Sequence, residues 1–260
     1  MSNSNKARNK IYMGTIVLEM NRWSSRVPSY LVSEWIDKIS AAGFEGLELW
    51  ENHVLRSPGE AEKIKASGFP VAVYNTYADF TDDAEETAKR TKAAEMIHFL
   101  GADAVKYNVG NNPELLPQYK QNLLKFADAL PADCVLLCEC HQGTQLEHND
   151  ILAEFFDDLC PQKFALMLHP FGPPEELETR FKLFGSRIAH MHSQILLDDK
   201  RVRLDRFPER AQASFDIMKA HAFTGGFTIE FTELTASPGE NIADLFANAV
   251  LDMQYIRRYM

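Results

Sequence analysis

The sequence predicts an α/β fold of one domain, a closed (β/α)₈ TIM barrel, and three observations lead to this prediction. Short apolar segments alternate with longer amphipathic segments eight times along the chain. No long linker or Pro/Ser-rich stretch interrupts the alternation. The chain has 260 residues, a common size for this barrel. Strands that alternate with helices pair in parallel through right-handed crossovers, so eight units favour a closed barrel over an open sheet.

Proline and glycine mark the expected helix ends in the first half of the chain. Pro28 is expected to begin the first helix, and Gly43 and Gly101 to follow the ends of the first and third helices. The third helix is rich in Ala, Glu and Lys, which favour helical backbone. Strands are predicted at residues 11–18, 46–50, 70–75 and 103–109, and helices at 28–42, 58–67, 82–100 and 113–130.

The second half repeats the same pattern. Strands are predicted at 134–140, 164–169, 187–192 and 227–232, and helices at 147–159, 174–184, 209–221 and 238–258. No G-x-G-x-x-G motif follows the first strand, which counts against a dinucleotide-binding fold, although an open sheet remains an alternative. The barrel domain is assigned to residues 11–260, and the polar residues 1–10 are expected to form a disordered tail.

Composition and charge limit the possible partners. The net charge of −10 argues against non-specific nucleic-acid binding, which depends on basic side chains. No segment has the length and apolarity of a secretory signal or a membrane span, so no membrane partner is expected. Cys138 and Cys140 form a C-x-C pair, which is neither a redox motif nor half of a zinc ribbon. With no disulfide pattern, we expect a cytoplasmic protein.

Four consecutive predicted strands end in a carboxylate or an imidazole, contributed by Glu139, His169, His192 and Glu230. A parallel barrel brings the carboxyl ends of its strands to one face, where its active sites lie. Charged groups at the ends of buried strands are costly unless they are paired or bind a metal. Two carboxylates and two imidazoles match the ligand preferences of Mn²⁺, Fe²⁺, Co²⁺ and Zn²⁺. The sequence therefore predicts one divalent-metal site.

Other strand ends supply candidates for substrate binding. The candidates on the second and third strands and in the loop between them are Glu48, Trp50, His53 and Asn75. For Trp50, simple packing is the alternative. Lys106 interrupts an apolar strand and needs a charged partner or a lowered pKa if it faces inward. An inward Lys106 could bind a substrate anion or stabilise an enolate, whereas a shift in register would turn it outward.

Two further segments could contact the substrate. His141 would face the same side as Glu139, two residues earlier on the strand. It could bind substrate or orient Glu139, or lie at the rim. The charged segment 193–208 could be a lid or a contact surface, and its Arg201, Arg203 and Arg206 could meet an acidic substrate. A solvated loop is the alternative for that segment.

Three of these segments resemble motifs of the xylose-isomerase-like barrels. This family includes sugar 3-epimerases, hydroxypyruvate isomerases, inosose dehydratases and endonuclease IV. Residues 139–144 read Glu-Cys-His-Gln-Gly-Thr and match the family's E-x-H-x-G-T pattern. Residues 190–192 match its h-x-H strand, and residues 225–230 match its glycine-led strand that ends in Glu.

The resemblance implies that Glu139, His192 and Glu230 are metal ligands. Where the family usually has Asp, this sequence has His169, so the site would contain two Glu and two His ligands. Imidazole is softer than carboxylate and shifts the metal preference away from Mg²⁺. The alternative is that His169 weakens or abolishes the site. The Lys-Asp pair that usually follows the histidine is also replaced, here by Ser193 and Gln194.

The implied activity is that of a metal-dependent isomerase or epimerase acting on a sugar or a sugar-derived keto-acid. Glu139 and Glu230 would be the catalytic residues, one removing a proton next to a metal-chelated carbonyl and the other, or water, returning it. The alternatives are a dehydratase or lyase using the same chemistry, and a non-catalytic sugar-binding barrel. An endonuclease IV-like enzyme is disfavoured because its additional metal ligands have no counterparts here. The resemblance also allows a homo-oligomer, without identifying an interface.

Overall fold

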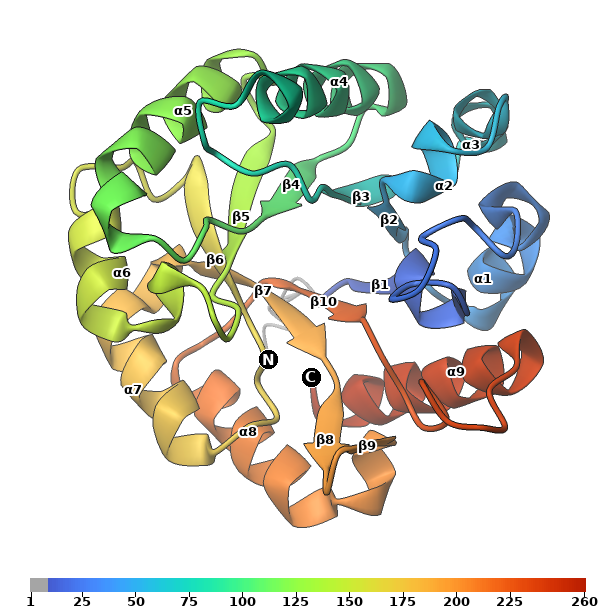
Figure 1. Ribbon diagram of the computed structural model, residues 1–260. Helices are drawn as coiled ribbons and strands as arrows, with labels where there is room; N and C mark the ends of the chain where they lie inside the picture. Colours follow the sequence, from blue (N-terminus) through green and yellow to red (C-terminus); the bar gives the residue numbers. More distant parts are fainter. Residues whose placement is uncertain (1–8) are drawn as a thin grey trace, which may run out of the picture.

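The computed structural model describes residues 9–260 and has the predicted architecture. Eight parallel strands close into a barrel in the order β1-β10-β7-β6-β5-β4-β3-β2, and helices surround them (Figure 1). The strands of the barrel are β1 (Ile11–Gly14), β2 (Leu47–Trp50), β3 (Val71–Asn75), β4 (Ala104–Tyr107), β5 (Val135–Glu139), β6 (Phe164–Leu168), β7 (Ile188–Ser193) and β10 (Gly226–Ile229). The predicted single-domain TIM barrel is therefore confirmed.

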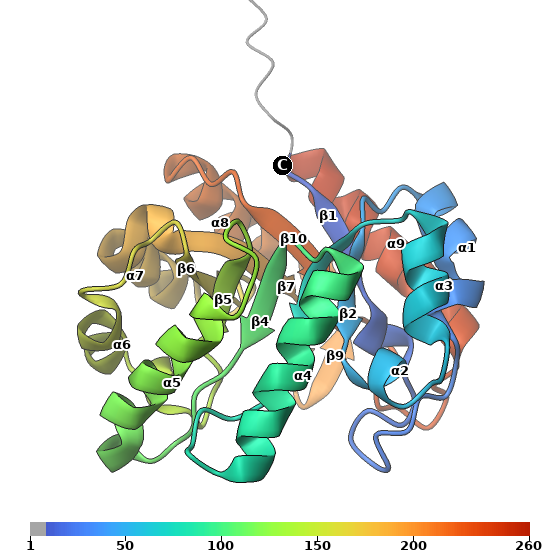
Figure 2. The same ribbon diagram turned by 90° about the horizontal axis from the view of Figure 1, so that it is seen from above.

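The helices form the outer layer, which is also seen from the side in Figure 2. Gly43 and Gly101 have positive φ angles of 102° and 70° and end α1 and α4, as the sequence predicts. The helices are α1 (Ile36–Ala42), α2 (Asn52–Leu55), α3 (Glu60–Ser67), α4 (Ala84–Leu100), α5 (Leu116–Asp128), α6 (Asn149–Phe156), α7 (Pro174–Phe184), α8 (Pro208–Ala220) and α9 (Ile242–Tyr259).

Three predicted boundaries differ from those of the structure by at least four residues. The first strand ends at Gly14, because residues 15–18 form a 3₁₀ turn over the barrel mouth instead of continuing the strand. A 3₁₀ turn at Val32–Glu34 precedes α1, which begins at Ile36 rather than near Pro28. The last helix begins at Ile242, where the Asn241 side chain accepts a hydrogen bond from the Asp244 amide and caps the helix.

The segment after β7 contains a β-hairpin that the sequence did not predict. Strands β8 (Ile195–Leu197) and β9 (Lys200–Val202) pair in an antiparallel manner. Asp198 and Asp199 join them with φ angles of 48° and 60°. Two residues with positive φ match the twist of a two-residue hairpin turn. The hairpin extends β7 outward at the carboxyl end of the barrel.

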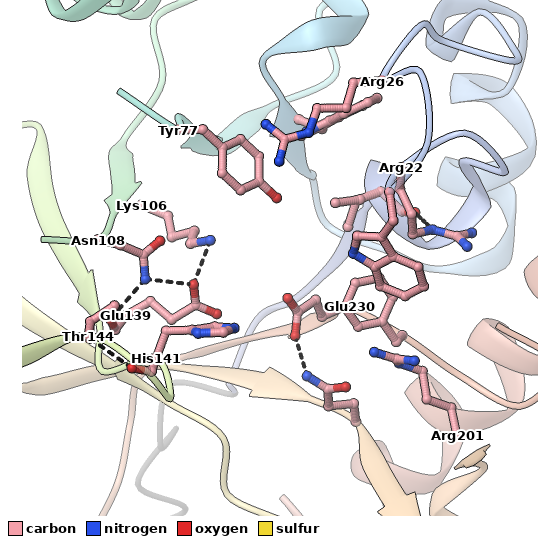
Figure 3. Close-up of a pocket in the computed structure, with 15 residues that line it drawn as sticks. Arg22, Arg26, Tyr77, Lys106, Asn108, Glu139, His141, Thr144, Arg201 and Glu230 are labelled. Atoms are coloured by element: carbon pink, nitrogen blue, oxygen red, sulfur yellow. Dashed lines mark hydrogen bonds and ion pairs between the residues drawn. The ribbon is translucent and has the colours of Figure 1, made fainter. Parts of the chain in front are cut away.

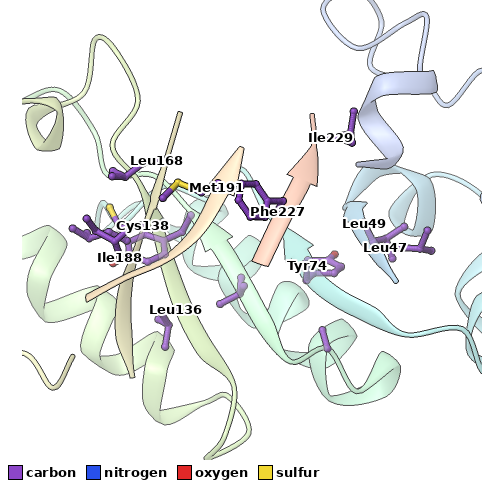
Figure 4. Packing of buried hydrophobic residues seen from close by; sticks show 14 of the residues in the cluster. Leu47, Leu49, Tyr74, Leu136, Cys138, Leu168, Ile188, Met191, Phe227 and Ile229 are labelled. Carbon is purple, nitrogen blue, oxygen red and sulfur yellow. The ribbon is translucent and has the colours of Figure 1, made fainter. Parts of the chain in front are cut away.

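Strand alternation separates the core into two layers. Every second residue of the strands packs outward against the helices, as Leu136, Cys138 and Met191 do (Figure 4). The other set faces the barrel axis, where a small inner cluster fills the lower part of the barrel. This inner cluster contains Ala72, Val73, Ala104, Leu137, Ala165 and Met167. Glu48, Lys106 and Glu139 have the inward parity and lie above it.

The two ends of the described chain meet at the amino end of the barrel. Residues 1–8 of the predicted tail lie outside the described residues, but Asn9 is buried and its side chain donates to the Gly225 carbonyl at 2.8 Å. Arg257, in α9, donates to the Asn9 carbonyl at 3.2 Å. The ordered packing thus begins before Ile11. Within residues 9–260, no helix is both long enough and apolar enough to cross a bilayer.

Candidate metal centre

The four predicted metal ligands converge at the carboxyl end of the barrel. Glu139 ends β5 and His192 belongs to β7, whereas His169 and Glu230 directly follow β6 and β10. All four have the inward-facing parity of their strands. One ligand atom from each side chain lies within 4.8 Å of the others.

The distances between these ligand atoms fit one shared metal ion. His169 Nε2 lies 3.4 Å from Glu139 Oε1 and 3.2 Å from Glu230 Oε2. His192 Nδ1 lies 3.1 Å from Glu139 Oε1 and 3.4 Å from Glu230 Oε2. Ligand atoms bound about 2.1 Å from a metal are about 3.0 Å apart at a right angle and about 3.4 Å apart at the tetrahedral angle. The four side chains therefore have the chemistry and the spacing of a divalent-metal site.

Three of the four side chains are buried, His169 is half-buried, and their charges compensate one another. Glu139 and His192 are 1% and 0% exposed. Burial disfavours the ionised form of Glu139, but Lys106 and His192 outweigh it and hold the pKa of Glu139 well below its usual range. Burial also disfavours a charged His192, yet Glu48 and Glu230 raise the pKa of His192 well above its usual value. The carboxylates are thus kept ionised, the form that binds a metal.

Glu48 orients the His192 ring by contacting Nε2, the ring nitrogen that points away from Glu139 and Glu230. The Glu48 carboxylate oxygens lie 2.9 and 2.8 Å from His192 Nε2, and Asn75 Nδ2 donates to Glu48 Oε1 at 3.1 Å. Metal binding would displace the proton on Nδ1, and with Nε2–H still donating to Glu48 the lone pair of Nδ1 would face the metal position. Glu48 and Asn75 were predicted to bind substrate, but neither lines the pocket. Glu48 lies two residues before Trp50 on the inward face of β2, so its side chain is deeper in the barrel.

The two candidate glutamate ligands differ in the contacts of the carboxylate oxygen that faces away from the two histidines. Glu139 Oε2 lies 2.6 Å from Lys106 Nζ and accepts a hydrogen bond from Asn108 Nδ2 at 3.1 Å. Glu230 Oε2 accepts a hydrogen bond from Gln194 Nε2 at 2.7 Å. Among residues 9–260, no side chain or amide donates to Glu230 Oε1. The contact between Lys106 and Glu139 also shows that Lys106 faces inward, with Glu139 as its charged partner.

A pocket of about 420 Å³ opens directly above the cluster (Figure 3). Of the residues predicted to contact substrate or carry out catalysis, six line it: Trp50, Lys106, Glu139, His141, Arg201 and Glu230. His53 does not line it, because the chain turns into α2 after β2. The imidazole of His53 is buried edge-on against the rings of Trp50 and Tyr30, at centroid distances of 5.3 and 4.8 Å.

The sequence did not single out several residues that complete the site. Asn108 lies two residues after Lys106 and so shares its inward side, a signal that could have identified it. Arg22, Arg26 and Tyr77 reach the pocket from the loops after β1 and β3. Strand periodicity contains no information about where such loop residues fold.

Comparisons with known proteins support the fold. No family model and no curated protein sequence matches this chain. A xylose isomerase-like TIM barrel/4-hydroxyphenylpyruvate dioxygenase fusion protein is similar over 95% of this chain, with a TM-score of 0.71 and 14% identity. The chain spans only 42% of the length of that fusion protein.

Two other solved structures are similar over nearly their full lengths. IOLI protein, solved with a bound zinc atom, has a TM-score of 0.70 and 13% identity, covering 96% of this chain and 99% of that one. D-psicose 3-epimerase, solved in the presence of D-fructose, gives the same TM-score, identity and coverage values. The predicted (β/α)₈ barrel fold is thus confirmed, and the structures similar to it include a xylose isomerase-like barrel. Because one fold carries many activities, function must be argued from the site.

Proposed function

We propose that this chain is a divalent-metal-dependent isomerase or epimerase that acts on a small polyhydroxylated ketone, either a sugar or a sugar-derived keto-acid. One observation carries the proposal: a cluster of two glutamates and two histidines, all buried except the half-buried His169, at the base of a sugar-sized polar pocket. The fold it shares with a sugar epimerase and with a zinc-binding protein agrees with this reading.

Glu139, His169, His192 and Glu230 would hold the metal. When bound, a divalent cation polarises a chelated carbonyl and acidifies the neighbouring C–H bond. The mixed carboxylate and imidazole set favours Mn²⁺, Fe²⁺, Co²⁺ or Zn²⁺ over Mg²⁺. The zinc atom in a protein of the same fold is consistent with that preference.

We assign proton transfer to Glu230 rather than to Glu139. Glu139 Oε2 is already bound by Lys106 and Asn108, whereas Glu230 Oε1 has no partner among the described residues. Glu230 also lines the pocket, so Oε1 can reach a substrate C–H group. A single base that removes a proton and returns it to the adjacent carbon suits isomerisation. Epimerisation would need a second proton donor on the opposite face of the substrate.

Lys106 and His141 complete the proposed machinery. The Lys106 ammonium group keeps Glu139 ionised and adds positive charge near an oxygen that becomes negative during proton abstraction. His141 lies at the exposed rim of the pocket, where it can hydrogen-bond a substrate hydroxyl group. Trp50 forms part of the apolar wall.

The test is proton exchange in deuterated water. Protein loaded with Mn²⁺, Co²⁺ or Zn²⁺ is incubated with a panel of ketoses, aldoses and keto-acids, and the products are analysed by NMR and mass spectrometry. We expect deuterium next to a carbonyl and a product of unchanged atomic composition. A product that is lighter than the substrate by one water molecule would instead indicate a dehydratase. Binding of sugar without exchange for any metal would indicate a non-catalytic barrel.

A matched pair of variants ties the reaction to the site. Glu230→Gln removes the proposed base, so exchange should fall by roughly 10²-fold or more. Glu233→Gln makes the same change three residues later, in an ion pair with Arg206 outside the pocket, and should retain exchange. Equal activity of the two variants would contradict the assignment of Glu230.

A further inference from the structure

Two arginines at the pocket have no acidic partner among residues 9–260. The basic side chains that line the pocket are Arg22, Arg26, Lys106 and Arg201. Lys106 is paired with Glu139, and Arg22 with Glu240 at 2.6 Å. In the described part of the chain, the guanidinium groups of Arg26 and Arg201 form no ion pair or hydrogen bond.

Arg201 is held in place by two aromatic rings. Its Cζ atom lies 4.8 Å from the centroid of the Trp23 ring and 4.5 Å from that of Phe231. Such cation–π contacts orient a guanidinium group without using its N–H donors. Arg201 Nε is buried and has no hydrogen-bond acceptor. A buried donor without an acceptor is energetically costly, so Arg201 Nε is available to donate a hydrogen bond to a bound ligand.

The fold places Arg201 beside the metal centre. Arg201 belongs to β9, in the hairpin that extends from the strand carrying His192. Phe231, against which Arg201 packs, directly follows the metal-ligand candidate Glu230. Figure 3 shows the Arg201 side chain pointing from the hairpin toward Glu230. A molecule that contacts the metal centre and fills the pocket would therefore also meet this guanidinium group.

Arg26 enters the same pocket from a different element. Its backbone has a positive φ of 56°, and its guanidinium carbon lies 5.5 Å from the centroid of the Tyr77 ring. In Figure 3, Arg26 and Arg201 approach the pocket from separate sides. The positive charges of the pocket that lack an acidic partner are thus those of these two arginines.

We propose that Arg201, assisted by Arg26, binds an anionic group, a carboxylate or a phosphate, on the substrate whose carbonyl lies at the metal centre. This inference rests on the proposed function and narrows its substrate class to acidic sugars. The guanidinium fork donates two parallel N–H bonds to a carboxylate or a phosphate. Hydroxyl groups of a neutral sugar would leave the charge of a half-buried arginine without compensation.

The experiment compares three ketoses that differ only at C6: D-fructose, D-fructuronate and D-fructose 6-phosphate. Their binding to Mn²⁺-loaded protein is measured by isothermal titration calorimetry. We expect one of the two acidic compounds to bind at least roughly tenfold more tightly than D-fructose, since charge-assisted bidentate hydrogen bonds are strong. Which acid binds more tightly distinguishes a carboxylate from a phosphate.

Variants connect that preference to Arg201. Arg201→Gln should abolish the preference while retaining bound metal and the melting temperature, and Arg201→Lys should restore only part of it. Arg206→Gln removes the same charge from an exposed arginine outside the pocket, paired with Glu233. This control should keep the preference.

The inference is overturned if D-fructose binds as tightly as both acids, if neither acid binds, or if the preference survives in Arg201→Gln. Its failure is distinct from that of the proposed function. Exchange on neutral ketoses without a preference for acids would leave the proposed function standing and remove this inference. If an acid binds in an Arg201-dependent manner but no substrate of the panel exchanges its proton, the proposed function fails and the anion-binding role of Arg201 stands.

Discussion

Glu48 lies beneath the candidate metal ligands and determines which nitrogen of His192 faces the metal position. Both of its oxygens lie within 2.9 Å of His192 Nε2. We expect Glu48→Gln to weaken metal affinity by roughly 10–100-fold, because a carboxylate behind a ligand histidine fixes its orientation and raises its basicity. Competition with a chelator measures the affinity.

A matched control for Glu48 lies at the opposite end of the barrel. Glu45 accepts hydrogen bonds from the Ile11 amide and from Arg257. Glu45→Gln removes a charge of the same kind far from the cluster and should leave metal affinity unchanged. Equal losses of affinity in the two variants would show that charge in general, rather than the contact with His192, is responsible.

Asp252 is another buried carboxylate, away from the candidate metal centre. It accepts hydrogen bonds from the Leu204 amide at 2.8 Å and the Thr232 hydroxyl at 2.6 Å, joining α9 to the segments after β9 and β10. Burial raises the pKa of Asp252 to about 7 against the opposing effect of these hydrogen bonds. The ionised form is therefore disfavoured in the folded protein.

This raised pKa predicts a pH-dependent stability. In the unfolded chain Asp252 ionises near its ordinary pKa of 3.8, so folding loses stability as the pH rises from about 4 to about 7 and changes little above that. Asp252→Asn cannot ionise and can still bond both partners. We expect the variant to be more stable than the wild type at pH 8, by roughly 1–3 kcal/mol, and equally stable near pH 4. Urea unfolding at the two pH values measures this, and an unchanged pH slope would refute it.

At the scale of elements, the β8–β9 hairpin depends on two aspartates with left-handed backbone. Asp199 has a φ of 60°, a conformation that glycine adopts at lower cost. Asp199→Gly should therefore raise the free energy of unfolding by roughly 0.5–1 kcal/mol. A higher melting temperature would show this gain. Asp205→Gly, in the 3₁₀ turn that follows β9, is the control and should give no such gain. A lower melting temperature for Asp199→Gly would mean that the turn does not limit the hairpin.

The success of the sequence predictions differed between elements for physical reasons. Gly43 and Gly101 identified helix ends correctly because only a left-handed residue closes a helix in that way. The apolar residues 15–18 looked like the end of a strand, but Gly14 lies so close to β10 that a Cβ atom there would be 2.6 Å from the Ile229 carbonyl oxygen. The chain leaves the sheet at this crowded position, which periodicity does not reveal.

At the scale of the whole molecule, the convergence of the four candidate metal ligands could be predicted because the barrel itself brings their side chains together. Parallel strands end at one face, so Glu139, His169, His192 and Glu230 needed only the correct strand order. The roles of Glu48 and Asn75 were not predictable in the same way, since depth within the barrel separates an orienting residue from one that lines the pocket. Arg26 and Tyr77 depend on loop conformations that the sequence pattern does not encode.

A metal that bridges four strand ends should also stabilise the entire barrel. Binding to the folded state alone adds about 2.7 kcal/mol when the free metal is at a hundred times its dissociation constant. We expect Mn²⁺ or Zn²⁺ to raise the melting temperature of chelator-treated protein, and Glu230→Ala to remove that increase. Differential scanning calorimetry measures both. An equal rise in the variant would place the stabilising metal elsewhere.

The contact between Arg257 and the Asn9 carbonyl has a practical use. It brings the first and last described segments together at the amino end of the barrel, whereas the pocket opens at the carboxyl end. A surface anchor or a fused reporter attached at either of these segments would leave the mouth facing solution. A short linker between them would likewise permit circular permutation, with new termini cut into an outer loop.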